Sequence, residues 1–185
     1  MSYFPSTQIT DNTEASRYAA ATAKTTPAAS TTDLFTFAGS STKTVYVTRV
    51  ELSFTHAGGA CVASECNLVK RSTAGSGGTS TTATSVPLDS NSSSATAGGL
   101  KAFTVNPTVG ALVGIIKAGD ILPQYSNGAT NTNPSTPNII IFDAVANQGP
   151  IVLRGTSEMI AINFNGTIPA GSTPKLSCTV FWREK

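Results

Sequence analysis

The sequence has few charged residues. Asp, Glu, Lys and Arg make up 12% of its 185 residues, about half of the usual share of roughly 25%. The net charge is only +2 and no run of five basic residues occurs, whereas proteins that bind nucleic acids or membranes usually carry a concentrated basic patch. We therefore predict no nucleic-acid partner and no membrane partner. A surface with so little charge suits contact with other proteins or a location outside cells.

Residues that carry catalysis are also scarce. The only histidine is His56, so a Ser-His-Asp triad would depend on this single residue. The chain has no Gly-x-Ser-x-Gly motif and no glycine-rich phosphate loop before a helix. Four carboxylates are expected to cap turns in loops or at strand ends: Asp89, Asp120, Asp143 and Glu158. We predict a protein that is not an enzyme, with no catalytic residues and no cofactor.

Cysteine occurs three times, at Cys61, Cys66 and Cys178. A small, odd number argues against a disulfide framework, and Cys178 has the alternating apolar neighbours of a buried strand residue. Cys61 and Cys66 either remain free thiols or pair across a hairpin end. Free thiols fit a chain assembled in a reducing cytoplasm. A cluster of these two cysteines with His56 matches no standard zinc spacing, so we predict no metal site.

Long apolar runs are absent as well. No stretch approaches the roughly 18 apolar residues of a membrane span. The first residues, Met1–Pro5, lack the basic and then apolar regions of a secretion signal. The sequence therefore predicts a chain with no recognisable anchor or secretion signal.

Residues 1–31 differ in composition from the rest. They are rich in Thr, Ala and Ser, and the part from Glu14 to Lys24 could form a short helix, although it lacks an apolar stripe. We predict a separate N-terminal segment that is either a flexible leader or an extended arm bound to a partner. The contacts of such an arm would come from its larger apolar residues: Tyr3, Phe4, Ile9 and Tyr18. Deletion of residues 1–30 is then expected to leave a folded domain that binds its partner poorly.

From Asp33 onward the pattern is that of β-strands. In Lys43–Thr55 the even-numbered residues from Tyr46 onward are expected on one face and the odd-numbered residues from Val45 on the other. Leu176–Arg183 alternates in the same way. Two segments that are apolar on both faces suit buried central strands: Ile139–Phe142 and Met159–Phe164. Five further strands are expected at Leu34–Phe37, Asn67–Arg71, Leu100–Val105, Leu112–Ile116 and Ile151–Arg154.

Clusters of Gly, Asn and Pro separate these segments. About nine or ten short strands with such turns are typical of an antiparallel β-sandwich, here expected to be jelly-roll-like. We predict one all-β domain over residues 32–185, preceded by the extended N-terminal arm. Two connections, 72–94 and 124–138, are long and rich in Ser, Thr and Asn, and loops of that length are usually functional or mobile.

Three stretches, taken together, resemble a known family. They are Leu68–Ser80 with Val86–Asn91 and Ser94–Ala97, then Asn106–Gly110, then Ile151–Asn163 with Gly166 and the closing pair Phe181 and Trp182. Their order resembles the small virion-associated structural proteins of tailed bacteriophages, over residues 36–184. The resemblance implies a β-sandwich component of the phage particle and supplies no catalytic residues.

Capsid decoration (cement) proteins of this size are commonly β-rich, trimeric and equipped with an arm. The resemblance therefore implies a protein of the virion, assembled in the host cytoplasm, that binds the major capsid protein and itself as a homotrimer. An ordered arm of about 30 residues could add contact on the order of 1,000 Å². Many copies bound as oligomers would offset the entropy that such an arm loses.

Two other functions fit the same sequence. A tail, fibre or baseplate component, or an adhesin for host-surface glycans, could use the two long polar loops as its binding surface. A carbohydrate-active enzyme on a jelly-roll scaffold would instead need two carboxylates about 5–10 Å apart in an open cleft.

Overall fold

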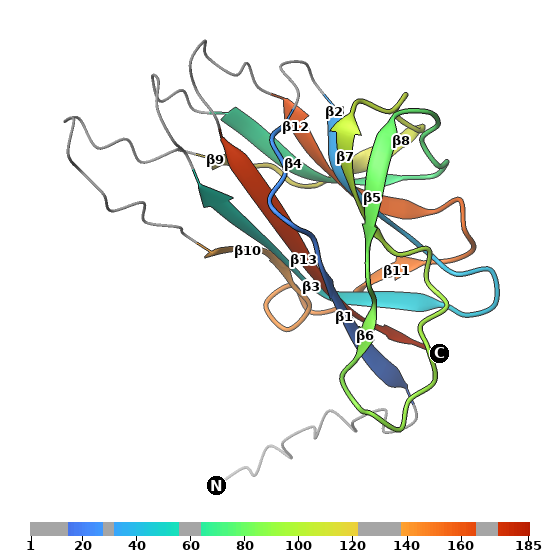
Figure 1. Cartoon of the computed structure of the whole chain (residues 1–185). Coiled ribbons are helices and arrows are strands. Elements are labelled where there is room, and N and C mark those ends of the chain that lie inside the picture. Colours follow the sequence, from blue (N-terminus) through green and yellow to red (C-terminus); the bar gives the residue numbers. More distant parts are fainter. Residues whose placement is uncertain (1–14, 28–31, 56–63, 122–137, 166–173) are drawn as a thin grey trace, which may run out of the picture.

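The structure, a computed structural model, describes residues 15–27, 32–55, 64–121, 138–165 and 174–185. Every regular element in these residues is a strand, so the prediction of an all-β protein is confirmed (Figure 1). The strands form two antiparallel sheets, an arrangement consistent with a β-sandwich. The described residues contain no helix that is long and apolar enough to cross a membrane.

The two sheets are called sheet A and sheet B below. Sheet A has the strand order β10 (Asn138–Asp143), β3 (Val45–Thr55), β13 (Lys175–Glu184), β1 (Ser16–Ala21), β6 (Val86–Pro87), and β11 (Ile151–Leu153) also pairs with β3. Sheet B has the order β5 (Thr79–Ala83), β7 (Leu100–Val105), β2 (Thr32–Ala38), β12 (Met159–Asn165), β4 (Ser64–Arg71), β8 (Leu112–Lys117), and β9 (Asp120–Ile121) also pairs with β4.

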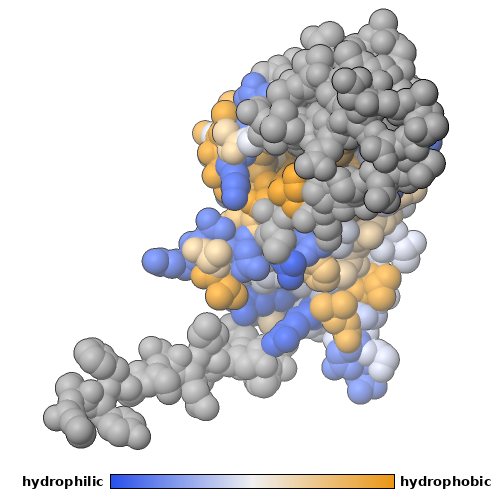
Figure 2. Space-filling view, turned by 90° about the vertical axis from the view of Figure 1, so that its left-hand side faces the viewer, coloured by the Kyte–Doolittle hydropathy of each residue, from blue (hydrophilic) through white to orange (hydrophobic). Residues whose placement is uncertain are grey.

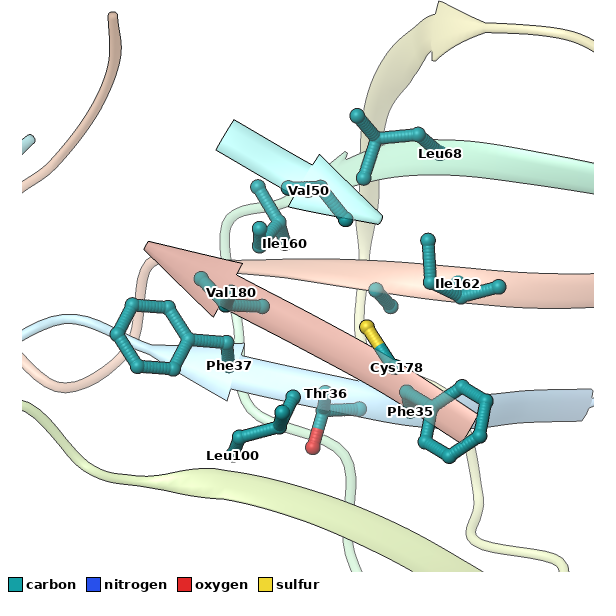
Figure 3. Close-up of a pocket in the computed structure, with 11 residues that line it drawn as sticks. Phe35, Thr36, Phe37, Val50, Leu68, Leu100, Ile160, Ile162, Cys178 and Val180 are labelled. Carbon is teal, nitrogen blue, oxygen red and sulfur yellow. The ribbon is translucent and has the colours of Figure 1, made fainter. Parts of the chain in front are cut away.

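The hydrophobic core lies between the two sheets. In Figure 3, Phe35, Phe37 and Ile162 of sheet B gather with Val50 and Val180 of sheet A. Together with their neighbours they enclose a void of about 10 Å³, which is at the lower limit for one water molecule. This void is too small to be a ligand site, and burial of the side chains around it stabilises the packing of the sheets.

β3 follows the predicted alternation over only part of its length. In its second half the even-numbered residues are buried as predicted, but near its start the buried residues are Val45 and Val47. The register with β13 shifts between these halves and leaves Thr48 as the extra residue of a β-bulge. A bulge inserts one residue into the period of two, so the predicted placement of Tyr46 on the same face as Val50 is wrong.

The first described strand corrects the predicted domain boundary at residue 31. β1 pairs with β13 along its whole length, so this part is neither a helix nor a separate leader. Tyr18 is fully buried in the core, with its ring centroid 5.6 Å from that of Trp182. Its prediction as a residue that contacts a partner is therefore wrong. Tyr3, Phe4 and Ile9 lie outside the described residues.

The same pairing argues against the expectation that the chain folds without residues 1–30, because that deletion would remove β1. The alternation of Tyr18 and Ala20 toward the core is weak in the sequence. Alanine is small and is the best helix former, so the run of alanines around Tyr18 resembles a helix as much as a strand.

Most other predicted strands are confirmed, and the exceptions have physical reasons. β5 and β6 lie inside the connection 72–94, where Thr and Ser give no apolar alternation. β10 is an edge strand and not a central one. Its bulge at Ile141 leaves both Ile141 and Phe142 buried, which produces the continuous apolar pattern. Most of the connection 124–138 lies outside the described residues.

Candidate functional site

An exposed aliphatic strand forms one edge of sheet B. β8 pairs with β4, and in the described part of the chain no strand pairs with its other edge. Its large apolar residues have between 38% and 60% of their surface exposed: Leu112, Val113, Ile115 and Ile116. These four residues are called the β8 patch below.

The composition of β8 is unusual for a free edge. An edge strand presents unpaired N–H and C=O groups, and proteins normally protect it with charges, proline, β-bulges or covering chain. The pairing of β8 with β4 has two register shifts. The only charged residue of β8 is Lys117, at its end. Contiguous apolar exposure of this kind marks surfaces that another protein covers, and an added strand is one way of covering them.

A buried ion pair fixes the chain that leads into β8. Arg71 of β4 donates two hydrogen bonds to the carboxylate of Asp33 on β2, with 2.7 Å between Nη2 and Oδ1. Its Nη1 also donates to the carbonyl oxygen of Gly110 at 2.8 Å, and Asn163 of β12 donates to Asp33 Oδ1 at 2.8 Å. Both charged residues are buried. The cluster therefore ties three strands of sheet B to the turn before β8.

That turn has no room for variation at Gly110. A Cβ atom there would lie 1.9 Å from the carbonyl oxygen of Thr73. The next amide, of Ala111, donates to the Thr73 hydroxyl at 2.7 Å, and the amide of Ser72 donates to the Ala111 carbonyl at 3.0 Å. These contacts thus hold the turn before the β8 patch in place.

A second buried carboxylate anchors the end of β13. Glu184 accepts hydrogen bonds from the amides of Thr96 and Ala97, each with a distance of 2.9 Å, and from the indole of Trp182 at 3.1 Å. Burial alone would raise the pKa of Glu184, but these hydrogen bonds outweigh it and lower the pKa from its usual value. Its role is to fasten the turn before β7 to sheet A.

We expect the Glu184→Gln variant to lose about 2 kcal/mol of unfolding free energy at pH 7, because an amide cannot replace a charged acceptor. The wild-type carboxylate stabilises the fold fully above its unfolded pKa of about 4.3. This stabilisation is lost as the pH falls through the lower pKa of the folded state. Urea unfolding between pH 3 and pH 7 should therefore show a shallower pH dependence in the variant. Equal slopes in the two proteins would contradict this assignment.

A groove of about 660 Å³ lies on the face of sheet A that is turned away from the core. Its lining includes Phe181 of β13, which alternates with buried neighbours. Leu88, after β6, lines it from one edge of the sheet, and residues between 143 and 150, at the end of β10 and in the turn after it, line it from the other. Leu88 and Val145 are both exposed. The volume falls in the range typical of ligand sites, roughly 300–1,000 Å³.

The groove carries more positive than negative groups. Three arginines line it: Arg17, Arg49 and Arg183. Asp143 is the only carboxylate in its described lining. Arg49 Nε lies 2.6 Å from Oε1 of Glu51, and the guanidinium of Arg183 lies 5.3 Å from the centre of the Tyr46 ring, a cation–π contact. Figure 2 views the left-hand side of Figure 1, and outside the grey area hydrophilic and hydrophobic residues lie next to one another.

Three of the four carboxylates that the sequence singles out cap turns, as predicted. Asp89 Oδ1 accepts from the amide of Asn91 at 2.9 Å, and Asp143 Oδ1 accepts from the amide of Val145 at 2.8 Å. Glu158 accepts from the amide of Arg154, and this hydrogen bond lowers the pKa of Glu158. The side chain of Asp120 lies outside the described residues, as does His56.

Two of the three cysteines are described, and both are free and buried. Burial raises the pKa of Cys66 to about 12 and also raises the pKa of Cys178. Both are therefore unreactive thiols at neutral pH. Cys61, the other half of the pairing left open above, lies outside the described residues.

Sequence reasoning missed Asp33, Arg71, Glu184 and the groove. Among the described residues no three His, Cys, Asp or Glu side chains are grouped so that they could hold a metal ion. No family model, curated protein or solved structure matches the chain. Its function has to be inferred from its residues, its strand order and its surfaces.

Proposed function

We propose that the protein is a non-enzymatic structural protein of a bacteriophage particle, a decoration (cement) protein that binds the outer capsid surface and stabilises subunit junctions. It binds the major capsid protein and associates with itself as a homotrimer. It is assembled in the host cytoplasm and resides on the virion. The observation that carries this proposal is the β8 patch. It is an apolar strand edge whose preceding turn is held in place, and it is suited to contact with protein.

The strand order supports the jelly-roll-like fold that belongs to this proposal. Four pairs are nested along the chain: β1 with β13, β2 with β12, β3 with β10, and β4 with β8. A long hairpin that rolls up gives such nesting, and its strands then alternate between two sheets. Jelly rolls are common in viral capsid and lectin domains. Because one fold hosts many functions, the surfaces have to select among them. In this proposal the N-terminal arm comprises only the residues before β1.

The size of the β8 patch favours binding as an oligomer. Complete burial of an aliphatic side chain contributes about 1.5–3 kcal/mol, so four half-exposed residues contribute a few kcal/mol when covered. Association costs about 4–15 kcal/mol in lost freedom. One patch alone would therefore bind weakly. Three patches in a homotrimer that bind together would raise the affinity through effective concentration.

Cryo-electron microscopy of intact particles tests the location. We expect density with this two-sheet shape on the outside of the capsid at subunit junctions, with β8 facing the major capsid protein. Density found only at the tail, fibre or baseplate would overturn the proposal in favour of the alternative function. Absence from the particle would overturn both.

The double variant Leu112→Asp/Ile115→Asp is expected to bind purified capsids at least about tenfold more weakly, because charges would enter an apolar interface. Co-sedimentation of the protein with capsids that lack it measures this affinity. Val86→Asp is a matched control, since Val86 is 53% exposed but lies on β6 of sheet A. It should bind like the wild type. Equal losses in both proteins would show that β8 is not the docking strand.

A further inference from the structure

We propose that the groove on sheet A binds residues 1–14 of a second copy of the chain. The proposal concerns how copies of the protein hold one another, and it does not depend on the capsid. It starts from the chemistry of the groove, continues with that of the segment, and uses the position at which β1 begins.

The chemistry of the groove fits a chain segment that is both acidic and apolar. Arg17, Arg49 and Arg183 line the groove together with one carboxylate, Asp143, and Arg49 is also paired with Glu51. Arginine guanidinium groups bind carboxylates through paired hydrogen bonds. The exposed Leu88 and Val145 give the same groove apolar surface. A small inorganic anion would leave this apolar surface in water, whereas a peptide segment would cover it.

Residues 1–14 have the complementary composition. They contain two acidic residues, Asp11 and Glu14, and neither Lys nor Arg. They also contain Tyr3, Phe4 and Ile9, whose side chains can bury the apolar part of the groove. Aromatic rings contact arginine favourably as well. Charge and apolar surface therefore match between the segment and the groove.

The position of the segment favours a second copy over the same chain. β1 begins at Ser16, and Arg17, the next residue, already lines the groove. The groove crosses β1, β13 and β3, so to enter its own groove the segment would have to turn sharply away from the line of β1 within one or two residues of Ser16. Fourteen extended residues reach about 45–50 Å, which is far enough to enter a neighbouring molecule without such a turn. A head-to-tail exchange of this kind forms a ring when the rotation between copies closes, and a closed ring of three copies is a trimer.

Photo-crosslinking of the full-length protein tests this contact. The photoreactive p-benzoyl-phenylalanine replaces Phe4, and copies with natural and heavy nitrogen are mixed, denatured, refolded together and irradiated. Mass spectrometry should find residue 4 linked to the groove turn 143–150 or to the end of β13, with both isotope labels in one crosslinked pair. Links confined to one label, or scattered over the surface away from the groove, would overturn the proposal.

A charge exchange gives a second, independent readout. Arg17→Glu should weaken self-association at least tenfold in analytical ultracentrifugation, and the added change Asp11→Arg should restore it. Lys101→Glu is the matched control, because it reverses one exposed positive charge on β7 of sheet B and should leave association unchanged. Thermal melting verifies that each variant is folded. Equal weakening by Arg17→Glu and Lys101→Glu, or no rescue, would overturn the proposal, while capsid binding through β8 would remain a separate question.

Discussion

The Asp33→Ala variant is expected to lose about 3–5 kcal/mol of unfolding free energy, because it leaves a buried charge without its partner. The side chain of Arg71 is only 6% exposed, so water cannot replace the lost carboxylate. Asn163 loses its acceptor in the same change. Since a domain of this kind is stable by about 5–15 kcal/mol, the loss is a large share of the total. Urea unfolding, followed by fluorescence of the only tryptophan, the buried Trp182, measures it.

Two further variants make this measurement specific. Asp89→Ala removes an exposed carboxylate that only caps a turn and should cost about 1 kcal/mol or less. The double variant Asp33→Ala/Arg71→Met removes both charges and should be more stable than Asp33→Ala alone, because no buried charge remains unpaired. If Asp33→Ala lost less than 1 kcal/mol, or if the double variant were the less stable of the two, the ion pair would not hold this part of sheet B.

The Asp33–Arg71 ion pair could not be predicted from the sequence, whereas β13 could. The alternation of apolar residues predicted β13 and its buried face, because the period of a strand is local information. Asp33 and Arg71 are 38 residues apart, and their contact depends on the order β2, β12, β4 and on its register. Neither is visible in a single sequence. A buried pair of charges therefore could not be distinguished from two solvated residues.

The β8 patch and the groove on sheet A could not be predicted from the sequence for the same reason. β8 was predicted as a strand, but a run that is apolar on both faces usually indicates a buried central strand. It is exposed because it stands last in sheet B. The arginines of the groove come from β1, β3 and β13, and the bulge at Thr48 sets where β3 places Arg49. Composition indicated a protein-contacting surface in general, while strand order decides where that surface lies.

Tyr18→Ala is expected to cost at least about 3–5 kcal/mol, the usual loss for a large aromatic residue in a core. Tyr18 has no exposed surface, stacks on Trp182 and donates a hydrogen bond from its hydroxyl to the carbonyl oxygen of Ser93 at 2.9 Å. The residue thus connects β1, β13 and the connection after β6. Urea unfolding and near-ultraviolet circular dichroism would report both the lost stability and the loosened aromatic packing.

Two truncations separate this structural role from that of the preceding arm. A chain that starts at Ala15 keeps every described strand and should fold, whereas one that starts at Thr22 lacks β1 and should expose Trp182 and the adjoining edge of β13. Tyr18→Phe is the matched point variant, since it keeps the ring and loses only the hydrogen bond, at a cost of about 1 kcal/mol. A stable, cooperatively unfolding chain that starts at Thr22 would show that the domain begins after β1. Because β1 joins β13 to β6 in sheet A, we expect the opposite result.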